Sequence, residues 1–280
     1  MKTGKSVGFA LDPDSARAAL THMRLLGYDC ADLQTFVNTE TEWFSAPDRL
    51  RRWEEIGRIA RDCGISFSQT HGPWRFPPQD YTEEDRAERF EKMSIALEGT
   101  AAVGAPCMAI HNIMPWGGDG LPDPERFLEM NREFFSRLIE KAKAAGVVIA
   151  LENMPFTKLI LSTPEQVLNF VKEFDSPYFR VCLDTGHAAV FGLSPADAVR
   201  LIGKDWLACL HVHDNDGRHD YHWLPFRGVV DWADFSKALH EIGFEGSLSL
   251  ETDVSGKLPD AVRQDWERTL AATARYLTLG

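Results

Sequence analysis

The segment CLHVHDNDGRHDYHW, residues 209–223, concentrates the residue types that bind metal ions. It holds four of the nine histidines of the 280-residue chain, together with three aspartates. Such a stretch is either a solvated polar loop or part of a metal site, because imidazole and carboxylate groups both bind divalent cations. Asp220 and His222 are two residues apart, close enough to bind one ion together. The segment alone does not decide between the two interpretations.

Further candidate ligands stand at the ends of short apolar runs elsewhere in the chain. Six consecutive runs each carry one: His71, His111, Glu152, Asp184 with His187 just beyond, His211 and Glu251. One isolated histidine or carboxylate in such a place is usually a hydrogen-bonded structural residue. Six in succession indicate a shared site, where converging carboxylates without a cation would repel one another strongly. We therefore expect a divalent metal, with Mn or Zn the best match to mixed ligands and Mg or Co as alternatives.

The elements that would position these side chains alternate in type. Eight apolar runs are predicted strands, and the segments between them have apolar residues at helical spacing. The runs are SVGFAL, DCADLQTF, ISFSQTH, CMAIHNI, VVIALEN, FRVCLD, LACLHVH and GSLSLET. The clearest helix covers residues 83–103, after a capping box of Thr82 with Asp85. Thr163-Pro164 and Ser194-Pro195 predict two more helix starts, and four glycines predict helix ends: Gly64, Gly104, Gly146 and Gly243.

Strands that alternate with helices imply a parallel sheet. Eight such units within about 250 residues imply a closed (β/α)8 barrel, here a single domain over residues 1–280. An open doubly wound sheet is the alternative, weakened by the absence of a glycine-rich phosphate loop after the first strand. Alternation favours the barrel, since Val148, Ala150 and Glu152 share one face of their run and bulky apolar residues the other. Barrel active sites lie at the carboxyl ends of the strands, where the candidate ligands fall.

Composition excludes several classes of protein. The net charge of −12 disfavours a nucleic-acid partner. No apolar run approaches the roughly 18 residues that span a membrane, so no membrane partner is expected. The N-terminal residues do not resemble a signal peptide. The five cysteines are odd in number and widely spaced, which predicts reduced thiols and a cytoplasmic location.

Four short motifs resemble the xylose-isomerase-like superfamily of (β/α)8 barrels: ALEN, CLDTGHA, HVHDNDG and SLETD. That superfamily includes sugar isomerases, sugar 3-epimerases, inosose and dehydroshikimate dehydratases, and abasic-site nucleases of the endonuclease IV type. The resemblance covers essentially the whole chain and implies one metal held by Glu152, Asp184, His211 and Glu251. The nucleases hold two further metals, whose ligands match His71 and His111 with Glu152, and His187 with Asp220 and His222.

The resemblance and the residues together predict an isomerase or epimerase of a sugar, sugar phosphate or cyclitol. Glu152 and Glu251 would transfer a proton through a metal-stabilised enediolate. The predicted substrate contacts are His187, His213, Arg218, Trp74 and Trp116, and His71, His111, Asp220 and His222 would bind either further metal or substrate. A metal-dependent dehydratase or lyase on a polyol or keto acid is one alternative, and an abasic-site DNA nuclease with a trinuclear Zn site is another. Homo-oligomers are common among such proteins.

Overall fold

A computed structural model of the chain describes residues 1–9, 12–74, 80–114, 123–252 and 254–279. Eight strands pair in parallel in the order β7-β6-β5-β4-β3-β2-β1-β8. They are β1 Lys2–Val7, β2 Cys30–Leu33, β3 Ser66–His71, β4 Cys107–Ile110, β5 Val148–Glu152, β6 Phe179–Asp184, β7 Leu207–His211 and β8 Ser247–Leu250. A bridge between Val212 and Leu250 closes the circle. The predicted (β/α)8 barrel is confirmed.

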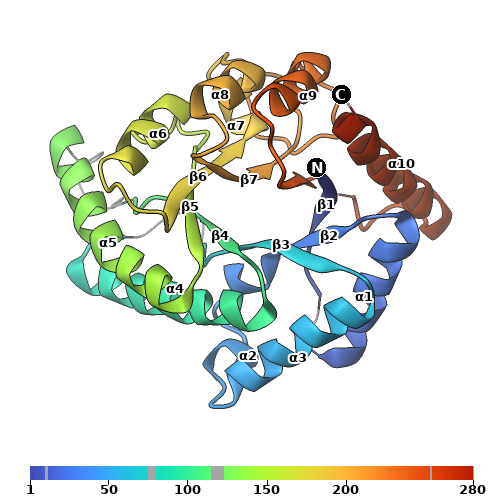
Figure 1. Cartoon of the computed structure of the whole chain (residues 1–280), viewed down its shortest axis with the longest axis horizontal. Helices are drawn as coiled ribbons and strands as arrows, with labels where there is room; N and C mark the ends of the chain where they lie inside the picture. The colour runs from blue at the N-terminus through green and yellow to red at the C-terminus, as the bar shows by residue number, and fades with distance from the viewer. Residues whose placement is uncertain (10–11, 75–79, 115–122, 253, 280) are drawn as a thin grey trace.

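Helices form a ring around the strands (Figure 1). They are α1 Pro13–Leu26, α2 Glu42–Ser45, α3 Arg49–Asp62, α4 Glu83–Val103, α5 Pro124–Ala145, α6 Pro164–Lys172, α7 Thr185–Val190, α8 Pro195–Ile202, α9 Trp232–Glu241 and α10 Asp260–Leu279, with a 3-10 turn η1 Gln34–Val37. Thr82 forms the predicted capping box with Asp85, and Thr163 and Ser194 cap α6 and α8. The four predicted helix-end glycines all have positive φ. Within the described ranges, no helix has the length and apolar character needed to cross a membrane.

Several predicted strand boundaries were wrong, among them those of the first two strands. The first strand begins at Lys2 rather than Ser6, because a stretch without bulky apolar residues still pairs with β2 and β8 on both sides. A Cβ on Gly4 would lie 2.4 Å from the Ser247 hydroxyl, so the crowded barrel interior suits glycine there. The second strand ends at Leu33, where the chain turns into η1.

Two strands carry a β-bulge just before a histidine of the predicted site. Ala31 pairs with Phe67 and Asp32 with Gln69, which leaves Ser68 as an extra residue on β3. On β7 the extra residue is Ala208. One added residue reverses which alternate side chains face the barrel axis. The bulges therefore set the inward direction of His71 and His211.

The barrel interior below the site is filled by small side chains, and the large apolar core lies between the barrel and the helices. The interior cluster is Cys107, Ala109, Ala150, Cys182 and Cys209. These residues confirm the predicted small or polar inward face of the strands. All five cysteines are free thiols.

A tight helix contact gives a test of this packing. A Cβ on Gly57 of α3 would lie 2.6 Å from the carbonyl oxygen of Val103, at the end of α4. Gly57→Ala would gain about 1 kcal/mol of helix propensity, but overpacking against a backbone atom costs about 1–3 kcal/mol. We expect a net loss of up to about 2 kcal/mol in the free energy of unfolding, measured by urea denaturation.

The exposed neighbour Arg58 provides the control for this substitution. Arg58→Ala should stay within about 0.5 kcal/mol of the parent protein. A Gly57→Ala protein more stable than its parent would contradict the described contact between α3 and α4.

Candidate metal centre

Four side chains from the carboxyl ends of successive strands converge at the mouth of the barrel: Glu152, Asp184, His211 and Glu251. One ligand atom of each lies within 4.8 Å of those of the others. The Nδ1 atom of His211 is 3.1 Å from Glu152 Oε1 and 3.4 Å from Glu251 Oε2. Two ligands bound to one ion at about 2.0–2.2 Å lie about 3.0–3.5 Å apart. The spacing of these atoms therefore fits a shared cation.

The second oxygen of Glu152 faces two more histidines. His111 Nε2 lies 3.2 Å from Glu152 Oε2, and His71 Nε2 lies 3.7 Å from it. His71, Glu152 and His211 together form a second set of atoms within 4.8 Å. Glu152 thus stands at the centre of the histidine cluster, as the resemblance to the nucleases implied.

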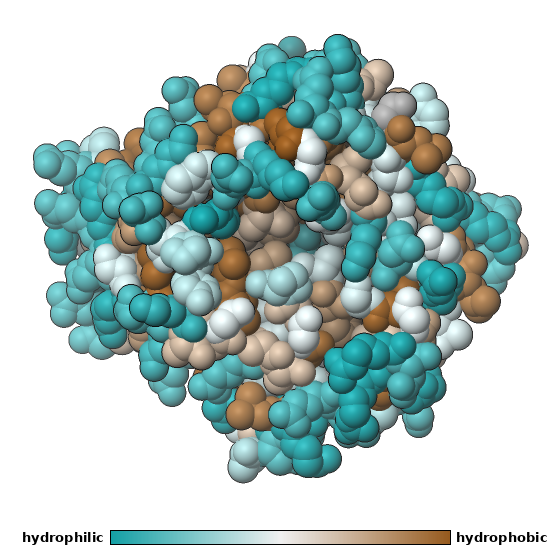
Figure 2. All heavy atoms as spheres, viewed as in Figure 1, coloured by the Kyte–Doolittle hydropathy of each residue, from teal (hydrophilic) through white to brown (hydrophobic). Residues whose placement is uncertain are grey.

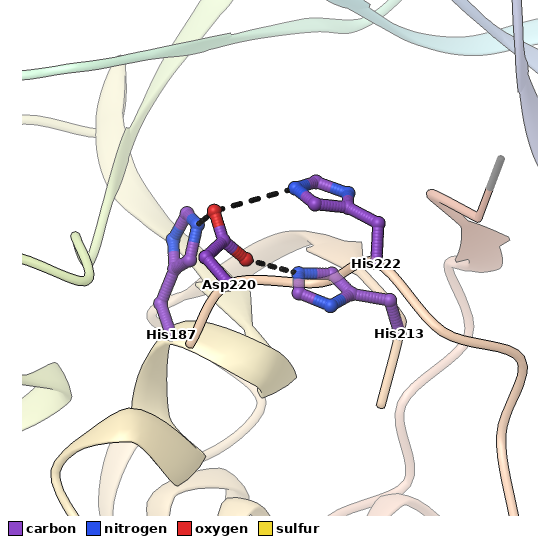
Figure 3. Close-up of side chains that lie close together, drawn as sticks. All are labelled: His187, His213, Asp220 and His222. Atoms are coloured by element: carbon purple, nitrogen blue, oxygen red, sulfur yellow. Dashed lines mark hydrogen bonds and ion pairs between the residues drawn. The ribbon is translucent and has the colours of Figure 1, made fainter. Parts of the chain in front are cut away.

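A third cluster surrounds Asp220. Figure 3 shows its carboxylate between His187 on one side and His213 and His222 on the other. Asp220 Oδ2 lies 3.2 Å from His187 Nε2 and 3.4 Å from His222 Nε2, and Oδ1 lies 3.5 Å from His213 Nε2. The structure brings together His187, Asp220 and His222, which the resemblance grouped, and adds His213, which was predicted as a substrate contact. The ring of His213 also stacks on that of His222.

Backbone carbonyl groups orient three of these imidazoles. Nδ1 of His71 lies 2.8 Å from the Gly72 oxygen, that of His187 lies 2.7 Å from the Asn153 oxygen, and that of His222 lies 2.9 Å from the Glu251 oxygen. A carbonyl oxygen only accepts, so each Nδ1 carries a proton and donates it. Each Nε2 is then directed at a carboxylate of the site, the orientation typical of metal-binding histidines.

The two glutamates have pKa values shifted in opposite directions. Burial alone raises the pKa of Glu152, but the neighbouring His211 and His111 overcome this and hold it well below its usual range. Burial, reinforced by the charge of Glu152, raises the pKa of Glu251 above its usual range. A pair of carboxyl groups separated in this way is typical of an acid and a base in one active site.

Glu152 Oε2 and both ring nitrogens of His211 have charged neighbours at 3.1–3.3 Å, but these contacts lack hydrogen-bond geometry. His213 Nδ1 has no hydrogen-bond partner among the described residues. Buried polar atoms are usually satisfied. In the described part of the chain, the ion pairs of Glu152, Asp184 and Glu251 are all with histidines. This donor set of carboxylate oxygens and imidazole nitrogens fits Mn or Zn.

A cavity of about 420 Å³ opens above the cluster, within the usual size range of small-molecule sites. Its polar lining is Gln34, His71, His111, Glu152, His187, Asp220, His222 and Glu251, and its apolar lining is Val37, Trp74, Met154, Pro155 and Phe156. On the face drawn in Figure 2, hydrophilic residues dominate the periphery, and paler or apolar residues gather toward the centre. The cavity therefore joins a wall of histidines and carboxylates to an apolar wall.

Two of the predicted substrate contacts among the described residues, His213 and Arg218, do not appear in this lining. His213 is fully buried against Asp184, with 3.0 Å between Nε2 and Oδ2, and Arg218 is exposed on its loop. Trp116 lies outside the described residues. The substrate roles of these residues stay predictions. Sequence reasoning missed Gln34 in the lining and Asp32 beneath it, although Asp32 lies two residues after the inward-facing Cys30 and so shares its face.

Metal binding around Asp220 should strengthen as the pH rises. Burial lowers the pKa of His187, but the Asp184 and Asp220 carboxylates overcome this and raise it to about 10. Burial also lowers the pKa of His222, but Asp220 and Glu251 overcome this and raise it to about 10. A cation must displace these protons. Calorimetric titration with Zn at pH 6 and pH 9 should therefore show tighter binding at the higher pH.

The same pKa shifts predict that the chelator-treated protein becomes less stable as the pH rises. A histidine with a raised pKa stabilises the fold fully below its unfolded value of 6.5, and this contribution is lost as the pH rises toward 10. The thermal midpoint of the chelator-treated protein should therefore fall over that window. Metal affinity that is independent of pH would contradict the described contacts of His187 and His222.

An eight-stranded barrel with histidines and carboxylates at the carboxyl ends of its strands defines a class of (β/α)8 protein with a polar site at the mouth. Residues 20–277 match the model of one family within that class, the xylose isomerase-like TIM barrel, and the chain belongs to this family.

Individual relatives agree with this assignment. The uncharacterised protein MJ1311 of Methanocaldococcus jannaschii is 30% identical over 198 residues, covering 67% of this chain and 65% of the relative. The D-psicose 3-epimerase of Ruminiclostridium cellulolyticum is 27% identical over 209 residues, covering 70% of this chain and 67% of the enzyme. The match thus spans about two thirds of these relatives. Several relatives are named as sugar epimerases, among them this D-psicose 3-epimerase and the ketose 3-epimerase of Arthrobacter globiformis.

Solved structures share the fold over the whole chain. The crystal structure of D-psicose 3-epimerase with D-tagatose from Clostridium cellulolyticum H10 has a TM-score of 0.80 at 19% identity, covering 99% of both chains. The crystal structure of the IolI protein with a bound zinc atom has a TM-score of 0.74 at 16% identity, covering 100% of this chain and 97% of that one.

Proposed function

We propose that the protein is a divalent-metal-dependent epimerase or isomerase of a ketose or related polyol, acting by proton transfer next to a carbonyl group. The observation that carries this proposal is the pair Glu152 and Glu251. Their carboxylates both approach Nδ1 of His211, at 3.1 and 3.4 Å, and both line the cavity. Their pKa values shift in opposite directions, as an acid and a base require.

The ligands of the cation would be Glu152, Asp184, His211 and Glu251. When bound, the cation supplies Lewis acidity that polarises the substrate carbonyl. Glu152, whose lowered pKa keeps it ionised, accepts the proton from the neighbouring carbon. Glu251 would return a proton to the carbon from another direction, through the carboxylate oxygen that does not bind the cation, and the two glutamates would then exchange protons with solvent. Positioned carboxyl groups of this kind contribute about 10²–10⁴-fold to the rate of a proton transfer.

The remaining lining suits a sugar. His111, whose pKa is lowered to about 4 chiefly by burial, is neutral near pH 7 and can exchange hydrogen bonds with hydroxyl groups. The ring of Trp74 lies 4.3 Å from that of His111, centroid to centroid. With Met154 and Phe156 it forms an apolar wall that keeps water from the reacting carbon.

The names of the relatives support the same class of substrate. They include D-psicose 3-epimerases and the ketose 3-epimerase of Arthrobacter globiformis. The zinc atom in the IolI crystal structure supports a metal in this fold. A dehydratase would begin with the same proton removal and then expel a hydroxyl group, so the product distinguishes the two reactions.

The cluster of His187, His213, Asp220 and His222 favours a second candidate, the abasic-site nuclease with three Zn ions. Its geometry could hold a further cation. Charge disfavours a DNA substrate, since the net charge is −12 and no Lys or Arg of the described residues lines the cavity. We therefore propose that this cluster serves substrate or one accessory cation.

Elemental analysis of untagged protein purified without chelator tests the assignment of the metal. We expect about one Mn, Zn, Co or Mg ion per chain, lost in Asp184→Asn and kept in His222→Asn. Asn at position 184 can still cap α7, as Asp184 does by accepting from the His187 amide. Close to three Zn per chain, with cleavage of an abasic-site oligonucleotide, would replace this proposal with the nuclease.

A further inference from the structure

A carboxylate lies directly beneath the predicted metal ligand His211. Asp32 on β2 is completely buried, and its Oδ2 atom is 3.3 Å from His211 Nε2. The amide groups of Gln34 and Gln69 donate hydrogen bonds to the same oxygen at 3.1 and 3.2 Å. Gln69 also donates to the Leu210 carbonyl oxygen on β7 at 3.1 Å. Asp32 is therefore fixed across the barrel to the strand that carries His211.

His211 is oriented differently from three other histidines of the site. His71, His187 and His222 each donate Nδ1–H to a backbone carbonyl. In His211 it is Nδ1 that faces Glu152 and Glu251, and Nε2 that faces Asp32. Asp32 therefore faces the ring nitrogen of His211 that points away from the cluster, as a backbone carbonyl does in His71, His187 and His222.

We propose that Asp32 is a positioning residue for the metal centre. Its Oδ2 atom lies 3.3 Å from His211 Nε2 and would accept the Nε2–H in the metal-loaded protein, which keeps the Nδ1 lone pair directed at the cation held with Glu152, Asp184 and Glu251. A carboxylate partner also makes the imidazole a stronger ligand. This role rests on the proposed function, since it requires that His211 bind a metal.

Two features favour this role over simple packing. Burying a carboxylate is costly, and an asparagine of the same shape could accept from the same two glutamines. The other oxygen of Asp32 is buried and has no hydrogen-bond partner. Buried polar atoms are usually paired, so packing alone does not explain a carboxylate at this position. The negative charge beneath His211 is useful where a cation binds above it.

The test is the metal affinity of Asp32→Asn, measured for Mn and Zn by competition with a chromophoric chelator. We expect binding to weaken about 10–100-fold, with the circular dichroism spectrum and the thermal midpoint of the chelator-treated protein retained. The control is Asp80→Asn, because Asp80 is also buried but bonds to Arg89 and to the Met114 amide, away from the four ligands. This control should lose stability and keep its metal affinity within about twofold.

A second readout reports on His211 itself. In the Zn-loaded protein with nitrogen-15 histidine, the Nε2 proton of His211 should give a slowly exchanging downfield signal that Asp32→Asn removes or moves upfield. An Asp32→Asn protein with parental affinity and an unchanged signal would overturn the positioning role alone. A parent protein that binds no Mn or Zn would overturn the proposed function, and this role with it.

Discussion

Glu152→Gln is expected to lower the turnover of a ketose substrate by about 10²–10⁴-fold in metal-saturated protein. The substitution keeps the shape of a fully buried side chain that contacts His211 Nδ1 and His111 Nε2, but it removes the group that accepts the proton. Steady-state rates measured at saturating Mn separate this loss from weaker metal binding.

Glu251→Gln tests the second carboxyl group, and Glu173→Gln is the control. Glu251→Gln should lose a comparable factor, because each carboxyl group serves one side of the transfer. Glu173→Gln removes only a partly exposed ion pair with Arg132 and should keep the parental rate. Parental turnover in metal-saturated Glu152→Gln would refute the catalytic assignment of Glu152.

Removal of the metal should destabilise the fold, since the cation offsets the repulsion of three converging carboxylates. A ligand present at 1,000 times its Kd stabilises a protein by about 4 kcal/mol, which corresponds to a thermal shift of roughly 10 °C in a chain of this size. Differential scanning calorimetry of chelator-treated protein, with and without added Mn, measures the shift.

His211→Asn should abolish this Mn-dependent shift. The matched control is His240→Asn, because His240 is an exposed histidine of α9 whose imidazole lies 3.2 Å from the Thr278 carbonyl oxygen. A shift that survives in His211→Asn would place the stabilising ion elsewhere.

The barrel could be predicted because its local signals agree with one another. The capping box of Thr82, the prolines after Thr163 and Ser194 and the helix-end glycines mark helix boundaries wherever they occur. The start of β1 could not be predicted, since Lys2 to Lys5 pair through backbone atoms and lack the side chains that mark a strand.

The convergence of the site could also be predicted, because parallel strands in a barrel bring their carboxyl ends to one rim. The exact partners could not. His213 joins Asp184 and Asp220 because Gly186 leaves room for its ring, where a Cβ would lie 1.9 Å away. Asp32 was missed because its role depends on Gln69, which a bulge turns inward. The position of the Arg218 loop is not fixed by the barrel.

The most direct test of the account follows solvent deuterium into a ketose. Metal-loaded protein is incubated in D2O with D-psicose, D-tagatose or D-fructose, and products are analysed by NMR and mass spectrometry. The account expects an epimerised or isomerised product that carries deuterium on a carbon next to the carbonyl, with none formed after chelator treatment. Product formed equally fast without metal, or no deuterium uptake from any ketose or cyclitol tested, would contradict it.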